Sequence, residues 1–262
     1  MPDEVIVQKS HRIGFDTQIW AVGTKPVEVE TRQELEKAIN ERTAMMFFLN
    51  VGDPKGQIKR DEWIEVAKKH NIPTMNDCAS DVPPVARLRE YVDQGFDLVV
   101  FSGGKGLIGP QASGLVLGQP ELVAAAQKAI SPRAGIGRGM KVGKEEIMGL
   151  VAAVERYHRI DHGAERAELD ARAKHVIETV RSIDGVTAEV LIPPIANQVP
   201  HVLVNWDAEK KGFTAREAAE KLRAGDPSIA VSQRDGGLRI SMWMLQPGEH
   251  LILATRVKEL FA

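Results

Sequence analysis

The sequence has little cysteine, no long apolar run and no excess of one charge. Its 262 residues include a single cysteine, Cys78. One thiol excludes a disulfide within the chain and any metal site built from several cysteines, and it fits a reducing cytosol. Lys and Arg number 34 against 36 Asp and Glu, a formal net charge of -2. This balance gives no support to a basic nucleic-acid-binding surface as the main function.

No apolar run is long enough to span a membrane, and the first residues lack the pattern of a secretory signal. We therefore expect a cytoplasmic protein with no membrane partner. The composition, 43% hydrophobic and 27% charged, is ordinary for a soluble protein. The length allows one large domain or two modest ones, and we expect two unequal domains.

The first half of the chain alternates short β-rich runs with helical stretches. Helices are expected at Thr31–Asn40, which opens with a Thr-x-x-Glu capping box, and at Asp61–His70. Strands are expected at Val5–Gln8, Pro26–Glu30, Ala44–Leu49, Pro73–Asp77, Leu98–Phe101 and Gly114–Leu117. This alternation predicts an α/β domain with a mostly parallel sheet. In such sheets the site lies at the carboxyl ends of the strands.

The second half begins with a long helical pattern from Lys144 to about Arg181, interrupted at Asp161–Gly163. We take this pattern as the connection between a large domain, residues 1–150, and a small C-terminal α+β domain, residues 151–262. The elements expected in the small domain are strands at Val186–Ile192, Val199–Trp206, Ile229–Gln233 and Gly237–Trp243 and helices at Thr214–Arg223 and Gly248–Phe261.

The most informative segment is Phe101–Gly114, with the sequence FSGGKGLIGPQASG. A strand ends there, and the loop that follows, with Ser102, Gly104 and Lys105, is too rich in glycine to be a helix. A lysine at the carboxyl end of a strand can form a Schiff base with a carbonyl group, while a hydroxyl and backbone amides hold a phosphate. The alternative reading of the motif alone is a surface lysine in a flexible turn.

Three further residues are candidates for the same site. Asp77 ends an apolar strand, where a carboxylate needs a cationic partner such as the protonated pyridine nitrogen of pyridoxal phosphate (PLP); otherwise it caps the next helix or turn. His11 follows the first strand and could stack on the cofactor ring, or it is a solvent-facing loop residue. Arg239 could grip a substrate carboxylate with its planar fork, or form a cross-strand ion pair.

His11, Asp77, Ser102 and Lys105 occur in the order and at the strand ends expected of fold-type-I PLP enzymes, the aspartate-aminotransferase-like superfamily. The chain resembles in particular the selenocysteine synthase (SelA)-like group, which includes D-glucosaminate-6-phosphate ammonia-lyase. The resemblance covers essentially the whole chain. The strings that carry it are VIVQKSHRIGFD, NDCASDVPP, DLVVFSGGKGLIGPQASGLVLG and IGRGMKVGKEEIMGLVAAVERY.

The resemblance implies a PLP-dependent transferase fold, with PLP as cofactor. Lys105 would carry PLP as a Schiff base, and Asp77 would pair with the pyridinium nitrogen and so strengthen the ring as an electron sink. His11 would stack on the ring. Ser102 and the amide at Gly104 would help to hold the phosphate.

The resemblance also implies contacts with a small amino substrate. Arg239 would bind the substrate carboxylate. Gln111 and the basic residues Arg138, Lys141 and Lys144 would contribute to the site or to a subunit interface, although a basic helix start is often only solvated. Active sites in this superfamily lie at a dimer interface, so we expect a homodimer or a higher homo-oligomer.

At its front the chain departs from the family pattern. Family members carry an N-terminal arm, helices, a first strand and a Ser/Thr-Gly-Ala-rich turn that grips the cofactor phosphate. This sequence starts beyond those elements, so we expect an N-terminally truncated large domain. The activity of the chain by itself is therefore left open, and a non-catalytic subunit is a rival interpretation.

The expected reaction is α,β-elimination by a PLP-dependent lyase of the ammonia-lyase type, on a small amino acid or amino sugar acid such as D-glucosaminate 6-phosphate. Lys105 would remove the α-proton as a base. One alternative is β-replacement like that of L-seryl-tRNA(Sec) selenium transferase, but the near-neutral charge disfavours tRNA as a partner. Transamination ranks third. A metal hydrolase could use His158 and His162, four residues apart with Asp161 adjacent, as two ligands. No third ligand is evident, so an exposed helix face is favoured over it.

Overall fold

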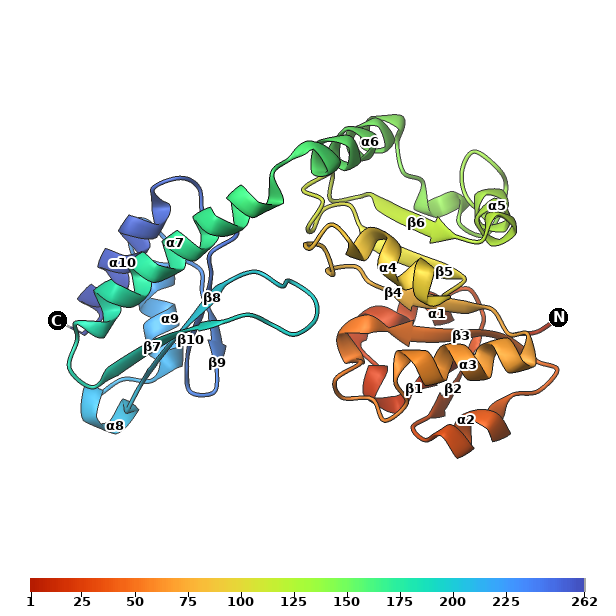
Figure 1. The fold of residues 1–262 in the computed structure, drawn as a ribbon, viewed down its shortest axis with the longest axis horizontal. Coiled ribbons are helices and arrows are strands. Elements are labelled where there is room, and N and C mark those ends of the chain that lie inside the picture. The colour runs from red at the N-terminus through yellow and green to blue at the C-terminus, as the bar shows by residue number, and fades with distance from the viewer. Residues whose placement is uncertain (262) are drawn as a thin grey trace. The chain divides into compact units, whose positions relative to one another are not determined.

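The computed structural model describes residues 1–261, which form two compact units. The first unit comprises Met1–Ile160 and Ile195–Asn197, and the second comprises Asp161–Pro194 and the chain from Gln198 onward (Figure 1). The boundary lies at Ile160 rather than at residue 150 because helix α6 (Lys144–Arg159) buries Tyr157 in the core of the first unit.

The first unit is built on a six-stranded sheet in which five strands are parallel. The order is β2-β1-β3-β4-β5-β6, and only β6 pairs antiparallel, with β5. The strands are β1 (Glu4–Gln8), β2 (Lys25–Val29), β3 (Thr43–Leu49), β4 (Thr74–Asp77), β5 (Leu98–Ser102) and β6 (Gly114–Gly118). Each predicted strand of this half is present, within one or two residues at its ends.

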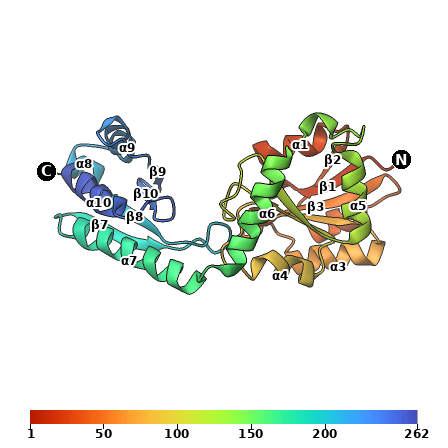
Figure 2. The same cartoon turned by 90° about the horizontal axis from the view of Figure 1, so that it is seen from above.

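Helices follow most of these strands. In the two views α3 and α4 lie on one side of the sheet and α1 on the other (Figures 1 and 2). Besides α6, the helices of this unit are α1 (Thr17–Trp20), α2 (Arg32–Ala38), α3 (Arg60–His70), α4 (Arg87–Gln94) and α5 (Pro120–Ala129). The Thr31 hydroxyl accepts a hydrogen bond from the Glu34 N–H, so the predicted capping box does start α2.

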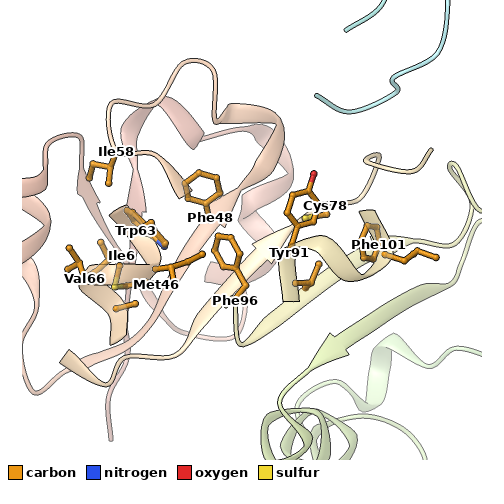
Figure 3. Packing of buried hydrophobic residues seen from close by; sticks show 14 of the residues in the cluster. Ile6, Met46, Phe48, Ile58, Trp63, Val66, Cys78, Tyr91, Phe96 and Phe101 are labelled. Atoms are coloured by element: carbon orange, nitrogen blue, oxygen red, sulfur yellow. The ribbon is translucent and has the colours of Figure 1, made fainter. Parts of the chain in front are cut away.

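The central strands are buried on both faces, as expected of a parallel sheet covered by helices. On the α3 side, Phe48 lies between Trp63 and Phe96, with ring centroids 5.8 and 5.7 Å away (Figure 3). Because side chains alternate along a strand, Phe47 and Leu49 point to the opposite face and join a second cluster. Burying one such side chain stabilises the fold by about 1.5–3 kcal/mol.

The second unit is a four-stranded antiparallel sheet with helices packed against it. The order is β7-β8-β10-β9. Its strands are β7 (Val186–Leu191), β8 (His201–Trp206), β9 (Ser232–Arg234) and β10 (Gly237–Ser241), and its helices are α7 (His162–Arg181), α8 (Ala208–Lys211), α9 (Ala215–Ala224) and α10 (Glu249–Glu259). The predicted interruption of the long helix corresponds to the end of α6 and the start of α7.

The predicted fold class is confirmed: a large unit with a mostly parallel sheet and a smaller α+β unit. Helices α4 and α5 were not predicted, and both are short. Within residues 1–261, no helix combines the length and the apolar composition needed to cross a membrane.

Candidate active site

A cavity of about 680 Å³ opens in the first unit where strands β4 and β5 end. Asp77 and Ser102 are the last residues of these two strands, and both line the cavity. The remaining lining residues are Ile13, Phe15, Gln18, Leu49, Val51, Ala79, Ser80, Asp81, Val100, Phe101, Lys105, Gln111 and Ser113. The cavity therefore lies where the sequence predicted a site, at the carboxyl ends of parallel strands.

Asp77 is held at the cavity by its strand and by the turn that follows. It pairs with Leu49 of β3 and Val100 of β5, and its Oδ1 accepts a hydrogen bond from the Ala79 N–H at 3.0 Å. Burial raises the pKa of the Asp77 carboxyl, and the hydrogen bond from Ala79 and the charge of Lys105 act in the opposite direction. A partly desolvated carboxylate of this kind favours a cationic or protonated partner.

Lys105 lies in a closed turn that follows β5. The Gly103 N–H donates to the Ser113 carbonyl at 2.9 Å, and the Gly109 N–H donates to the Gly103 carbonyl at 2.7 Å. The Lys105 carbonyl accepts from the Ile108 N–H at 2.9 Å. These bonds fix the turn while the Lys105 side chain stays exposed to the cavity.

The glycines of this turn are required by space. A Cβ on Gly103 would lie 2.0 Å from Ser113 Oγ, and one on Gly104 would lie 2.7 Å from the Gln111 Cα. The Gln111 side chain crosses the turn and donates from Nε2 to the Gly104 carbonyl at 3.1 Å. The close approach of backbone segments explains why the sequence here is glycine-rich.

A second cavity of about 370 Å³ shares part of the lining, including Phe15, Leu49 and Asp77. Its walls are mostly apolar, with Phe47, Met75 and Met140 among them. Together the two cavities form one recess with an ionisable side and an apolar side. Recesses of this size, apolar with a few convergent polar groups, are typical of small-molecule sites.

The structure brings together four of the predicted site residues: Lys105, Asp77, Ser102 and Gln111 all line the larger cavity. Gly104 is adjacent to Lys105 in the same turn. Arg138 lies in the short 3-10 helix Arg138–Met140 and is exposed, outside the cavity lining. Lys141 and Lys144 are likewise exposed.

His11 is not placed with the cavity residues, and its predicted stacking position is not seen. The side chain is 0% exposed and packs edge-on against Phe48 at 4.5 Å between centroids. Its Nδ1 accepts from the Leu49 N–H at 3.3 Å, and its Nε2 lies 3.2 Å from the Gln8 amide nitrogen. Desolvation lowers the pKa of His11 to about 4. The ring is thus a neutral, hydrogen-bonded part of the core.

Arg239 belongs to the second unit, in β10, opposite Leu203 of β8. Its Nε donates to the Ser232 hydroxyl at 3.3 Å, so its contact across the sheet is a hydrogen bond to a neutral side chain. Its role in binding a substrate carboxylate stays a prediction. Among residues 1–261 there is no cluster of three or more His, Cys, Asp or Glu side chains that could hold a metal ion, which includes the region of His158 and His162.

Asp81 and Ser113 are among the cavity residues that were not singled out from the sequence. Asp81 follows Asp77 by four residues and is 2% exposed. A signal was present in NDCASDVPP, where a second acid lies between the end of an apolar strand and two prolines. Ser113 belongs to the glycine-rich segment, and its hydroxyl donates to the Pro110 carbonyl at 2.6 Å.

Comparison with known proteins gives relatives along the whole chain. The D-glucosaminate-6-phosphate ammonia lyase of Salmonella typhimurium is 29% identical over an alignment of 276 positions, gaps included, which covers 99% of this chain and 71% of that protein. The 5'-C-glycyluridine monooxygenase-decarboxylase of a Streptomyces species is 32% identical over an alignment of 278 positions, gaps included, which covers 99% of this chain and 67% of that protein.

Solved structures show the same fold. A structure of D-glucosaminate-6-phosphate ammonia-lyase matches with a TM-score of 0.80 at 29% identity, over 99% of this chain and 73% of that one. Serine palmitoyltransferase from S. paucimobilis, solved with a PLP–myriocin aldimine, matches with a TM-score of 0.59 at 14% identity, over 98% of this chain and 66% of that one. This second likeness shows the fold alone.

A family model described as "SelA: L-seryl-tRNA selenium transferase" matches residues 17–168. That segment contains β2 to β6, the turn with Lys105, and most of the cavity lining. The predicted resemblance to SelA-like proteins and the predicted PLP-dependent transferase fold are confirmed by these matches. Because the match covers more than half of the chain, this protein belongs to the SelA family.

Proposed function

We propose that this chain is a PLP-dependent lyase that acts by α,β-elimination on a small amino acid or amino sugar acid. The α-proton and the β-hydroxyl leave together as water, and the resulting enamine is hydrolysed to a keto acid and ammonia. D-glucosaminate 6-phosphate is the first substrate to test. One observation carries the proposal: Lys105 and Asp77 line a single cavity at the ends of two neighbouring parallel strands.

The comparisons confirm the predicted enzyme class and cofactor. A relative aligned over 99% of the chain is named an ammonia lyase, and a solved structure of an ammonia-lyase of the same name matches with a TM-score of 0.80. A further protein of the same fold holds PLP. The substrate itself comes only from the name of the 29% identical relative, so it belongs to the proposal.

The residues of the cavity fit PLP. Lys105 offers a primary amine for covalent attachment, and Asp77 offers a partly desolvated carboxylate to a protonated ring nitrogen. Ser102 and Ser113 offer hydroxyl groups, and the turn at Gly104 offers backbone amides to a phosphate. The apolar walls, among them Phe15, suit the faces of an aromatic ring.

When bound, PLP supplies an electron sink for the bonding pair released at the substrate α-carbon. The chain's own residues supply the base, the contacts that orient the reactants and the exclusion of water. Lys105 Nζ can accept the α-proton, because its side chain reaches into the cavity from a turn fixed by hydrogen bonds. Asp77 would pair with the protonated ring nitrogen, and the apolar side of the recess would keep water from the reacting carbon. Gln111, held at Gly104, is a candidate hydrogen-bond donor to the substrate.

The test is ammonia release from D-glucosaminate 6-phosphate by the purified chain with added PLP. The wild-type chain should release ammonia, and Lys105→Ala should lose at least about 100-fold, the usual contribution of a positioned acid or base. Lys128→Ala, which removes an exposed lysine from α5, is the matched control. A chain that binds PLP but eliminates nothing from phosphorylated or unphosphorylated amino acids and amino sugar acids would refute the proposed reaction.

A second candidate is β-replacement on seryl-tRNA, which the description of the matching family model favours. The charge of the chain, -2 overall, offers no general attraction to tRNA. A filter-binding assay with seryl-tRNA separates the two candidates. Salt-sensitive binding together with loss of the seryl hydroxyl would favour replacement, and no binding would favour the lyase.

We also propose a homo-oligomer, with the chain in the cytoplasm. Large apolar side chains are exposed in residues 136–151: Ile136, Met140, Val142, Ile147, Met148 and Val151. Exposed apolar side chains that gather in this way are typical of an interface between subunits. Light scattering after size exclusion should give at least a dimer, and Met148→Lys should reduce the mass. A wild-type monomer at micromolar concentration would refute the oligomer.

A further inference from the structure

The carboxyl group of Asp81 is an unusual part of the cavity wall because it is almost completely buried. Asp81 lies in the loop after β4, lines the cavity with Lys105 and Asp77, and is 2% exposed. A buried carboxyl group is costly unless hydrogen bonds satisfy it. Its partners therefore show what the group is used for.

The partners of Asp81 come from different elements of the unit. Asn50, in the 3-10 turn after β3, donates from Nδ2 to Asp81 Oδ2. The same Nδ2 lies 2.8 Å from the hydroxyl of Tyr91 in α4, and this hydroxyl also hydrogen-bonds Asp81. The Cys78 thiol is a further partner. One side chain thus ties the loop after β4 to the end of β3 and to α4.

Hydrogen bonds offset the cost of burying the Asp81 carboxyl. Burial raises the pKa of its carboxyl, against the hydrogen bonds from Asn50 and Tyr91 and the charge of Arg87. The other titratable neighbours, Cys78 and Tyr91, have pKa values that are also raised by burial. An asparagine at position 81 would keep the size and an accepting oxygen, so it can mimic this role.

The residue after Asp81 lies directly against the turn that carries Lys105. A Cβ on Gly106 would be 1.9 Å from the Val82 carbonyl oxygen and 2.7 Å from its carbonyl carbon. Val82 and Leu107 are both 0% exposed and belong to one core cluster. The backbone at Val82 therefore sets where Gly106, and with it Lys105, can lie.

We propose that Asp81 is a positioning residue: by anchoring its loop to Asn50 and Tyr91, it holds the Val82 backbone against Gly106 and so fixes the turn of Lys105. Its importance for catalysis rests on the proposed role of Lys105. The positioning itself is a property of the chain without cofactor. The two claims can therefore fail separately.

The test is hydrogen exchange by mass spectrometry on the whole chain without cofactor. The variants are Asp81→Ala, Asp81→Asn and, as a matched control, Asp93→Ala, which removes an exposed carboxylate of α4. In Asp81→Ala, amides in peptides covering residues 101–113 should exchange about tenfold faster, the scale of one lost buried hydrogen bond. Asp81→Asn and Asp93→Ala should stay close to wild type, and peptides of α9 in the second unit should not change.

A second variant tests the contact through Gly106. Gly106→Ala leaves Asp81 and its partners in place but pushes on Val82, so it should speed exchange in the same peptides. Unchanged exchange at residues 101–113 in Asp81→Ala would overturn the proposal, and unchanged exchange in Gly106→Ala would overturn the contact through Val82. An equal increase in exchange throughout the first unit would also overturn the proposal, because Asp81 would then act only on the general stability of the unit. Failure of Asp81→Asn to restore protection would overturn it too, because the charge of Asp81 would then be what matters.

Addition of PLP gives a separate spectroscopic readout. If Lys105 binds PLP, Asp81→Ala should slow the appearance of the visible band about tenfold, again the scale of one lost buried hydrogen bond, and Asp81→Asn should restore it. A wild-type chain that gives no band would refute the cofactor role of Lys105. The exchange result would still decide the positioning by itself.

Discussion

The substitution Gly103→Ala tests whether close packing behind Lys105 shapes the site. A Cβ on Gly103 would lie 2.0 Å from Ser113 Oγ, 3.1 Å from Ser113 Cβ and 3.0 Å from Leu150 Cδ1. The Ser113 hydroxyl cannot move away without giving up its hydrogen bond to the Pro110 carbonyl at 2.6 Å. Overpacking costs about 1–3 kcal/mol, and the lost hydrogen bond costs about 1 kcal/mol more.

We therefore expect Gly103→Ala to destabilise the first unit by about 2–4 kcal/mol. Gly114→Ala is the matched control, because Gly114 pairs with Ser102 beside the same turn and its nearest neighbour, the Phe101 carbonyl, would be 3.5 Å from a Cβ. That variant should change stability by less than about 1 kcal/mol. The double variant Gly103→Ala with Ser113→Gly should recover much of the loss, because it removes both Ser113 atoms that the new methyl group meets.

The assay is urea denaturation in which hydrogen exchange of peptides reports the unfolding of each unit separately, because a chain with two units need not unfold in one step. Peptides from β4 and β5 should report the loss, and peptides from β8 and β10 should not. Equal effects of Gly103→Ala and Gly114→Ala would refute the reasoning. Failure of Ser113→Gly to compensate would refute the contact with Ser113.

Three further variants test single groups. The pKa of buried His11 is lowered from 6.5 to about 4, so between these pH values the unfolded chain binds more protons than the folded chain. Wild type should therefore lose about 3 kcal/mol of stability as pH falls through that range, and His11→Gln should lose less. Burial raises the pKa of Asp77, so stability is lost as pH rises; in thermal melts without cofactor, Asp77→Asn should be more stable than wild type at pH 7 and should lose this advantage in acid. Tyr91→Phe removes the hydroxyl shared by Asn50 and Asp81 and should cost about 1–2 kcal/mol in urea denaturation; no loss would contradict the network.

The strands were predictable from the sequence because their signal is local. Buried parallel strands such as Thr43–Leu49 form apolar runs bounded by turn residues, and a run of this kind has few other uses in a globular unit. The direction of β6 was not predictable, since periodicity says nothing about which neighbour a strand pairs with. Helix α4 (Arg87–Gln94) follows two prolines and has only eight residues, too few for a clear helical period.

The part of the candidate site that lies at strand ends could also be predicted from the sequence. Asp77 ends β4 and Lys105 lies in the turn just after β5, and the carboxyl ends of parallel strands meet at one edge of a sheet. His11 has the same sequence context, yet its ring is buried between Phe48 and the end of β3, because the side-chain direction depends on tertiary packing. Asp81 was missed since its use depends on Asn50 and Tyr91, which lie 31 and 10 residues away in sequence.

The central claim is that Lys105 holds PLP in this cavity. The most direct measurement is borohydride reduction of the PLP-treated chain, followed by peptide mapping and by comparison of the visible spectra of wild type, Lys105→Ala and Lys128→Ala. The account predicts a visible band that borohydride removes, an adduct on Lys105 in wild type and in Lys128→Ala, and neither band nor adduct in Lys105→Ala. A reducible adduct on another lysine, or an undiminished band in Lys105→Ala, would contradict it.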